Sequence, residues 1–260
     1  MTAIARIIQD HARPAVHIRR SKQPTRSHFG GQPNLPAGVE WPEHDGRRLT
    51  LLARVSLPEM QAAQAIDWLP REGALLFFYD AEEEPRGFDP KDAGSARVLQ
   101  VPDLAEPARA DEGGPGDFDL GTQPITFASI LSPPGPHRER FEIQPDDVEA
   151  FEALGAEVYG GKPRHQMGGL PHCVQNDAME LECQLVTHGL YLGDETGWND
   201  PRAQQLAPGA ADWRLLLQLD DDDEPGMPMW GDCGLLYFWI RGQDARSGRF
   251  DRGWTILQCG

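Results

Sequence analysis

The sequence predicts an α+β fold that is rich in β-strand, with two related subdomains in tandem, mainly antiparallel sheets and short flanking helices. Three observations lead to this prediction. The 28 glycines and 23 prolines indicate many turns and short elements rather than long helices. Apolar runs of strand length recur along the chain, and four sequence blocks occur twice in the same order. A chain of 260 residues is long enough for one large domain or two small ones.

The N-terminal part of the chain predicts a helix followed by strands. Apolar residues at positions 4, 7 and 8 share one face of a helix that Pro14 ends. An edge strand is expected over residues 15–20, and a longer strand over 49–55. Ser56 follows as the cap of a short helix.

The next part contains a central strand and a long connection. Residues 74–79 are apolar on both alternating faces, which is typical of a strand covered on both sides. Residues 97–101 predict the third strand of the first half. Residues 102–121 are rich in Pro, Gly and acids and predict a linker or mobile loop, with strands expected over 122–130 and 141–143.

The C-terminal part alternates short helices with apolar strands. A helix is expected over residues 144–155, with acids in its first turn and Gly155 as its stop. Asp177 and Glu180 form a capping-box pattern that opens another helix, and Asp200 opens a third by the same logic. The strands expected after these helices cover residues 213–220, 230–240 and 254–259.

The two halves of the chain share an ordered set of blocks. The blocks are the Gly-Gly-x-Pro turns at 30–33 and 168–171 and the strand segments that start at Leu51 and Leu215, Leu75 and Leu235, and Val98 and Ile256. The strand segments are 24 and 23 residues apart in the first half and 20 and 21 apart in the second. We therefore expect a duplicated unit arranged about a pseudo-twofold axis.

The duplication predicts four segments. Residues 1–26 form an N-terminal helix and a basic segment, and residues 27–101 form the first repeat subdomain. Residues 102–143 form a linker with connecting strands, and residues 144–260 form the second repeat subdomain with a helical insertion.

Several of these motifs resemble a known family. A Gly-Gly-x-Pro turn, a Leu-rich strand ending in Gln-Leu-Asp220, a Trp-Gly-Asp232 motif and the segment from Trp254 to Gln-Cys259 are similar to those of the YwqG-like proteins, a bacterial family of unknown function. The resemblance extends from about Ser27 to Cys259. It implies a β-rich α+β fold with an internal repeat and no established activity. Members tend to have a serine after the aspartate that corresponds to Asp220, where this chain has an acidic run.

The charge distribution limits the classes of partner. The formal net charge is −17, although residues 1–30 carry +5, so the remaining chain carries −22. An acidic body argues against nucleic acid and suits a basic protein partner or a cation. No apolar run reaches the ~18–20 residues of a membrane span. The four cysteines form no CxxC pair, which favours free thiols in a reducing cytoplasm.

Catalytic and metal motifs are weak in this sequence, and we expect no cofactor. The acidic run 220–224 places carboxylates near Asp232, so Asp220, Asp222 and Asp232 are candidate ligands for Ca²⁺ or Mg²⁺, although the spacing is not that of an EF-hand. Zinc-type residues lie close together in sequence without a known spacing: His165, His172, Cys173, Cys183 and His188. No Gly-x-Ser-x-Gly elbow is present.

Polar and aromatic residues of the repeats suggest a cleft where the two halves meet. The proposed lining is Gln218, Asp220, Trp230, Asp232, Trp254 and Gln258. The alternative is that the polar members satisfy each other or bind loop backbone. Gly30, Gly31, Gly168 and Gly169 predict tight turns where the backbone comes close to another group, more often protein than ligand. Cys233 and Cys259 are expected at the same end of the sheet, as a disulfide or as buried neighbours.

These observations favour a non-enzymatic binding protein of the bacterial cytoplasm. Its acidic surface would engage a basic protein partner, as an adaptor or an immunity protein does. The alternative is an enzyme or small-ligand binder that uses the inter-repeat cleft, with or without a divalent cation.

Overall fold

The computed structural model describes residues 3–103, 120–135, 148–222 and 229–260. The elements of the first half are α1 (Ala3–His11), β1 (Arg13–Arg20), β2 (His28–Phe29), β3 (Glu43–His44), β4 (Arg47–Arg48), β5 (Thr50–Ser56), α2 (Leu57–Ala63), β6 (Ala74–Tyr79), the 3₁₀ helix η1 (Pro90–Asp92), β7 (Ala96–Val101) and β8 (Gln123–Ser132). Those of the second half are α3 (Val148–Tyr159), β9 (Gln166–Gly168), α4 (Met179–Val186), α5 (Glu195–Trp198), α6 (Pro201–Leu206), η4 (Ala207–Asp212), β10 (Trp213–Asp220), β11 (Leu235–Arg241), α7 (Gly242–Arg246), η5 (Phe250–Arg252) and β12 (Trp254–Gln258).

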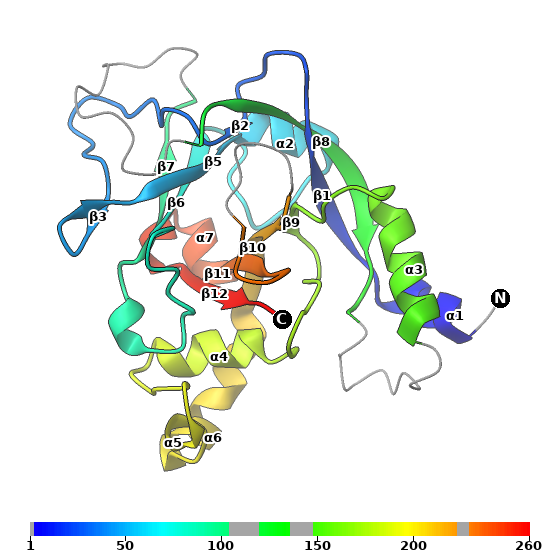
Figure 1. Ribbon diagram of the computed structural model, residues 1–260, viewed down its shortest axis with the longest axis vertical. Coiled ribbons are helices and arrows are strands. Elements are labelled where there is room, and N and C mark those ends of the chain that lie inside the picture. The colour runs from blue at the N-terminus through cyan, green and yellow to red at the C-terminus, as the bar shows by residue number, and fades with distance from the viewer. Residues whose placement is uncertain (1–2, 104–119, 136–147, 223–228) are drawn as a thin grey trace.

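Ten strands form one antiparallel sheet that curls until it is nearly closed (Figure 1). The strand order is β12-β11-β10-β9-β1-β8-β2-β5-β6-β7, and β3 pairs with β4 in a separate hairpin. The centre is the pair β1 and β8, joined from Arg13–Ser132 to Arg20–Ile125. The prediction of an edge strand over 15–20 is therefore wrong. Its charged ends suggested exposure, but Ala15 to Ile18 are buried and β1 also pairs with β9.

The strand order is symmetric about the β1–β8 pair. Moving outward, β9, β10, β11 and β12 on one side correspond to β2, β5, β6 and β7 on the other. A bulge lies between Leu51 and Ala53 in β5, and another lies between Leu215 and Leu217 in β10, at matching places of the repeat. Bulges are specific features of a strand, so their correspondence is what a duplicated unit predicts.

The two halves do not separate into two units, because they share one sheet and one interior. The largest apolar cluster lies inside the curled sheet and takes residues from both halves. Phe77 packs edge-on against Phe238 with ring centroids 5.3 Å apart, and Tyr79 packs against Trp230 at 5.9 Å. The interior is therefore a common core, and the segment boundaries given above remain predictions.

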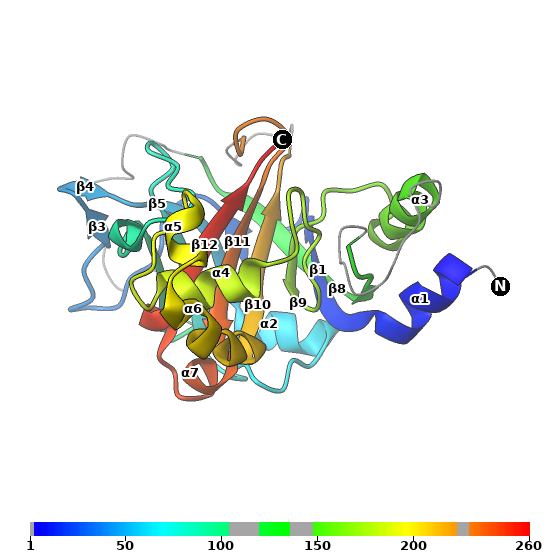
Figure 2. The ribbon, with the colours of Figure 1, turned by 90° about the horizontal axis from the view of Figure 1, so that it is seen from below.

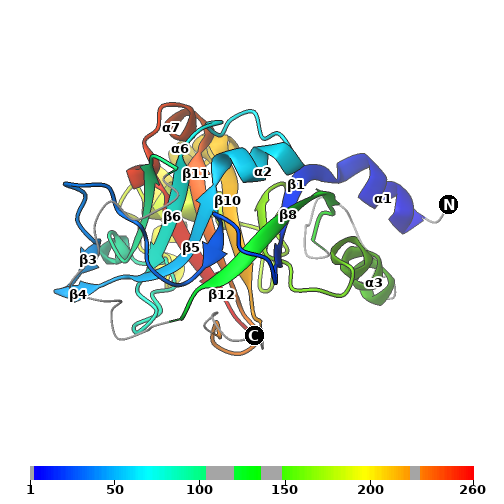
Figure 3. The same cartoon turned by 90° about the horizontal axis from the view of Figure 1, so that it is seen from above.

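Helices and loops cover the outer faces of the sheet. α4 lies across β10 and β12 and closes a second apolar cluster around Trp213, Tyr237 and Trp239 (Figure 1). α1 and α3 lie together beside β1 and β8, away from α5 and α6 (Figure 2). α2 packs beside β8 (Figure 3), but its buried Leu57 and Met60 belong to the interior cluster and not to an outer face. None of the helices in the described ranges has the length and apolar character that a membrane crossing requires.

A loop of the first half bridges the gap between the two edge strands. The backbone N–H of Leu257 in β12 donates to the carbonyl of Arg86 at 3.2 Å. The indole Nε1 of Trp254 donates to the carbonyl of Gly87 at 2.9 Å. Gly87 has a φ of +79°, and a Cβ there would overlap the carbonyl of Thr255, so the close approach requires glycine.

Helix ends are where the local predictions are least accurate. Gly155 does not stop α3, which continues to Tyr159 and ends before Gly160 and Gly161 with their positive φ values. Ser56 is the N-cap of α2, but its side chain makes no capping hydrogen bond. Asp200 does cap α6, with the N–H of Arg202 donating at 2.8 Å.

Two further predictions need correction, and others fall on residues outside those that the structure describes. The capping-box prediction at Asp177 is wrong, because α4 starts at Met179 with Ala178 as its N-cap. β11 starts at Leu235 rather than at Trp230, because residues 231–233 form a turn. The strand expected over 141–143, most of the loop 102–121, the start of the helix expected over 144–155 and the acids at 223 and 224 lie outside the described residues.

Candidate functional site

Gln218 and Gln258 are fully buried and hold loop backbone rather than lining a cleft. The Gln218 amide donates to the carbonyl of Arg164 at 2.7 Å and accepts from the N–H of His172 at 2.8 Å. Gln258 Oε1 accepts from the N–H groups of residues 174 and 175, and its Nε2 donates to the carbonyl of residue 176. Together the two side chains fasten the Gly-Gly-x-Pro loop of the second half to the outer face of the sheet.

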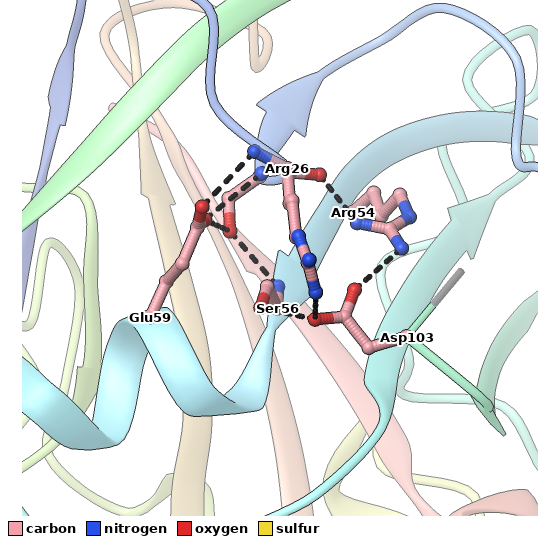
Figure 4. Close-up of polar contacts among 6 residues, drawn as sticks. Arg26, Arg54, Ser56, Glu59 and Asp103 are labelled. Carbon is pink, nitrogen blue, oxygen red and sulfur yellow. Dashed lines mark hydrogen bonds and ion pairs between the residues drawn. The ribbon is translucent and has the colours of Figure 1, made fainter. Parts of the chain in front are cut away.

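The first half holds its corresponding loop with an ion pair. Arg54 stands where the second half has Gln218, and its Nη2 lies 2.7 Å from Asp103 Oδ1 (Figure 4). Arg54 also donates to the backbone carbonyl of Arg26, as Gln218 does to that of Arg164. Burial raises the pKa of Asp103, but hydrogen bonds from Ser56, Arg54 and Arg26 outweigh burial, so the net shift of the pKa is downward.

A second pair of contacts completes this network. Ser56 Oγ donates to Asp103 Oδ2 at 2.7 Å, and Ser27 Oγ donates to Glu59 Oε2 at 2.6 Å (Figure 4). The N–H of Ser56 donates to Ser27 Oγ at 2.9 Å. The carboxylates and hydroxyls of this network all have partners within the protein, although Arg54 Nε has none among the described residues, so the network is a structural clamp between the start of β2, β5, α2 and the end of β7.

In the second half, ionisable residues stand at the positions of the two serines: Asp220 corresponds to Ser56, and His165 corresponds to Ser27. The Asp220 carboxylate accepts from the N–H of Arg164 at 2.6 Å, and burial raises the pKa of Asp220. The N–H of Asp220 donates to His165 Nδ1 at 3.0 Å. The proton of His165 therefore sits on Nε2, which faces Asp222 Oδ2 at 3.4 Å.

Asp222 joins β1 to β10 through a buried ion pair that sequence reasoning missed. Arg20 Nε lies 2.7 Å from Asp222 Oδ2, and the Asp222 side chain is 5% exposed. The Arg20 guanidinium also lies over the Phe29 ring, 5.8 Å from its centroid. Arg20 and Asp222 are about two hundred residues apart, and no local pattern signals their pairing.

The remaining residues of the predicted cleft lie in different places. Trp230 is buried inside the sheet, with its indole Nε1 unpartnered among the described residues. Asp232 is exposed in the turn before β11, and its backbone carbonyl accepts from the N–H of Gly260 at 2.9 Å. Of the six predicted lining residues, all of them described, only Trp254 lines either of the two cavities considered below.

The four turn glycines approach other parts of the protein. Gly30, Gly31, Gly168 and Gly169 all have positive φ values between 56° and 73°. A Cβ on Gly30 would overlap the carbonyl of Gly121, and one on Gly169 would overlap the Ser132 side chain. The first turn is tight because residues 120–122 pass beside it, and the second because Ile66 and Ser132 approach it closely.

The described residues contain no group of three or more His, Cys, Asp and Glu side chains placed to hold a metal ion. Asp220 and Asp222 are occupied by the contacts above. His172 Nε2 lies 2.5 Å from Arg164 Nη1, and His188 Nδ1 lies 2.6 Å from the carbonyl of Gln184. Cys173 and Cys183 belong to the apolar cluster under α4, and burial raises the pKa of the Cys183 thiol.

The four cysteines, all within the described ranges, form no disulfide. Cys233 is exposed in the turn before β11, and Cys259 is buried at the end of β12. A Cβ on Gly231 would lie 3.3 Å from Cys259 Sγ, so this turn packs directly on Cys259.

A cleft of about 1090 Å³, which we name the α4 cleft, opens between the two halves. Its walls come from both halves: the α1–β1 junction, the loop after α2, the second Gly-Gly-x-Pro turn, the start of α4 and the segment that leads into β10. Trp68, Ile66, Leu170 and Leu181 contribute apolar surface.

Two carboxylates in the α4 cleft are unpartnered. Asp67 is exposed on the first-half wall, and Asp177 is half-buried on the second-half wall. Among the described residues neither side chain takes a hydrogen bond or an ion pair. Asp177 is in this position because it does not cap α4.

The arginines of the cleft are occupied by backbone. Arg13 Nη1 donates to the carbonyls of the two preceding residues at 3.0 and 3.1 Å. Arg214 Nη1 donates to the carbonyls of Ala211 and Trp213 at 2.7 and 2.8 Å. Both guanidinium groups therefore have backbone acceptors and keep their positive charge beside the carboxylates of Asp67, Asp177 and Glu180.

Comparison with known proteins identifies the family but no function. A search of curated proteins finds no match. The YwqG-like name that the motifs suggest stays a resemblance. The model of a family described as a domain of unknown function, DUF1963, matches residues 27–259, which is most of the sequence. The chain therefore belongs to the DUF1963 family.

Proposed function

We propose that this protein is a non-enzymatic binding protein, and that the α4 cleft receives a basic segment of a protein partner. The main support is a pair of carboxylates in one cleft, Asp67 from the first half and Asp177 from the second, which have no partner among the described residues. Lysine or arginine side chains would form charge-assisted hydrogen bonds with both.

The openness and the lining of the cleft favour a protein segment over a small molecule. Small-ligand pockets usually enclose most of the ligand. The α4 cleft, with a volume of about 1090 Å³, is open to solvent. Apolar side chains such as Trp68 and Leu181 lie beside the carboxylates, so a segment with both basic and apolar residues fits best.

The charge of the whole chain supports the same partner. A net charge of −17 would attract a basic protein and speed its association, as electrostatic steering does in other complexes. The absence of disulfides among the four cysteines favours the cytoplasm as the compartment. An adaptor or an immunity protein is the role we propose.

The fixed contacts of the histidines support a non-enzymatic role. His165 is held between the N–H of Asp220 and the carboxylate of Asp222, and His188 faces the carbonyl at the end of α4. A general base must be able to reach a substrate proton, whereas both ring nitrogens of His165 and the Nδ1 of His188 face groups of the protein.

Capture from a native lysate tests the proposal with matched variants. The cleft variant is Asp67→Asn with Asp177→Asn. The control is Glu40→Gln with Glu195→Gln, which removes the same charge at exposed sites outside the cleft. We expect a partner that binds the wild type and the control at low salt, that is lost with the cleft variant, and that is weakened at about 0.5 M salt.

Two results would contradict the proposal. One is a wild-type protein that captures no partner at low salt. The other is a partner that the cleft variant retains as well as the control does, because binding would then not depend on the two cleft carboxylates.

A further inference from the structure

A second cavity of about 410 Å³ lies on another side of the molecule, again between the two halves. Residues 90–97 of the first half form one wall, and the end of α4, Arg241 and residues 251–255 form the other. Its volume is in the range of small-molecule pockets. Trp254 contributes an aromatic wall, with its ring held in place by the bond to the carbonyl of Gly87.

Three guanidinium groups from three different elements reach this cavity. Arg97 comes from β7, Arg241 from the end of β11 and Arg252 from η5. The concentration is unusual for a chain with a net charge of −17. Arginine presents a planar fork of donors that matches carboxylate and phosphate groups.

Arg241 is positioned for a ligand by the protein around it. Its guanidinium lies over the Trp213 ring at 4.5 Å, and its Nη2 donates to Gln184 Oε1 at 3.1 Å and Thr187 Oγ1 at 3.3 Å. These hydrogen-bond partners are neutral and use one of its three nitrogens. Burial lowers the pKa of Arg241 and outweighs the nearby carboxylates of Asp244 and Asp212, which raise it. An anion in the cavity would supply hydrogen-bond acceptors for the other nitrogens.

The other charged groups leave this arrangement available. Arg97 is exposed and makes one long bond, at 3.5 Å, to the carbonyl of Ala96. Asp92 is turned to backbone, since its Oδ2 accepts from the N–H of Gly87 at 2.9 Å. Arg252 lies 3.7 Å from Asp244, a loose ion pair, and Asp251 is exposed.

We propose that this cavity binds a small organic anion, whose carboxylate or phosphate group pairs with Arg97 and Arg241 while its body lies against Trp254. The site is separate from the α4 cleft and does not depend on its function. In this proposal the gap between the two edge strands of the sheet, β7 and β12, is a ligand-binding site.

The test uses three probes that share one ring: phenyl phosphate, benzoate and neutral benzyl alcohol. Calorimetric titration is performed on the wild type, Arg97→Ala, Arg241→Lys and the control Arg71→Ala, which removes an exposed arginine outside the cavity. At least one anion should bind more tightly than benzyl alcohol. Arg97→Ala and Arg241→Lys should weaken that binding about tenfold, and Arg71→Ala should weaken it less than about twofold.

The pattern of binding identifies the chemistry. Preference for phenyl phosphate assigns a phosphate ligand, and preference for benzoate assigns a carboxylate. The proposal is overturned if neither anion binds better than benzyl alcohol, or if Arg97→Ala keeps the wild-type affinity. Because Arg97 is exposed, its variant decides the question even where Arg241→Lys fails to fold.

Discussion

Residues at matching places in the repeats have different surroundings. Gln258 is buried and makes three hydrogen bonds to loop backbone, whereas Gln100 is exposed on the edge strand β7. Arg54 and Gln218 both hold a loop carbonyl, but only Arg54 does so as part of an ion pair with Asp103. The two halves therefore match in strand position but differ in how they hold the loop, with a charged clamp in the first half and a neutral glutamine in the second.

This difference predicts unequal effects of the same substitution. Gln258→Ala leaves two N–H groups and one carbonyl unpaired, so we expect it to lower the free energy of unfolding by about 3 kcal/mol. Gln100→Ala should change it by less than about 0.5 kcal/mol. Urea denaturation measures both. Equal effects would show that Gln258 is not an anchor of the loop.

Glu182 is a buried carboxylate that predicts a specific pH dependence. It is 2% exposed, and burial raises its pKa from 4.5 to about 7. Asn176 Nδ2 donates to Oε1 at 3.1 Å, and Oε2 has no partner among the described residues. The folded protein keeps a proton that the unfolded chain releases above its lower pKa. Stability therefore falls as pH rises from 4.5 to 7 and is then level, a loss of roughly 3 kcal/mol.

Replacing the carboxylate removes this loss. The free energy of unfolding of Glu182→Gln relative to the wild type should increase between pH 5 and pH 8, by up to roughly 3 kcal/mol. The exposed Glu195→Gln serves as the control, and its difference from the wild type should not change with pH. Denaturation curves at the two pH values give the comparison. A constant difference for Glu182→Gln would contradict the raised pKa.

Among the elements, the Gly-Gly-x-Pro turns connect sequence to architecture most directly. The first turn lies against the segment just before β8, the second reaches Ser132 at the end of β8, and both lead toward the first long strand of their half. Gly169 has a φ of +72°, and a Cβ there would overlap Ser132 Oγ, which accepts from the N–H of Leu170 at 2.8 Å. Gly161 has a φ of +66° but faces open space.

Alanine substitutions at these two glycines distinguish the cost of a left-handed backbone from the cost of steric overlap. Alanine at either position costs about 1–2 kcal/mol for the left-handed backbone. Gly169→Ala should cost about 1–3 kcal/mol more, because Ser132 and Ala15 must move. Thermal unfolding of the two variants gives the comparison, and similar losses would mean that the turn has room to adjust.

Local sequence patterns predicted most strands and fewer helix ends. The apolar runs of β6 and β10 give their bounds directly, because every position is explained by burial on the sheet. The central place of β1 was not predictable, since it depends on pairing with β8 more than a hundred residues away. The helix end at Tyr159 was missed because a glycine inside a helix costs only about 1 kcal/mol, which packing can offset.

At the scale of the whole molecule, the shared interior predicts coupling between the halves. Phe77 and Phe238 belong to different repeats and contact each other inside the sheet. A double-mutant cycle with Phe77→Leu and Phe238→Leu should give a coupling energy of about 0.5–1.5 kcal/mol. The control replaces Phe78, which points to the outer face, and should be additive with Phe238→Leu within about 0.5 kcal/mol. Additivity in both cycles would mean that the halves are energetically separate.

The candidate site was the part that sequence could least predict. The sequence prediction placed matching polar residues of the repeats in a cleft, because it assumed that buried polar side chains face a ligand. In the structure, Gln218 and Gln258 face backbone. The α4 cleft depends on Asp67 and Asp177, which come from different halves and stand in no motif that marks a site. Only the three-dimensional arrangement shows that, within the part of the chain that the structure describes, both carboxylates lack a partner.

Titration of a short fluorescent peptide that carries arginine and leucine side chains tests the role of the α4 cleft most directly. The peptide should bind the wild type and the control Glu40→Gln/Glu195→Gln with similar affinity, and should bind Asp67→Asn/Asp177→Asn at least about tenfold more weakly. Both double variants remove the same charge, so general attraction to the acidic protein cancels. Equal affinity for the two double variants would contradict a binding role for the α4 cleft.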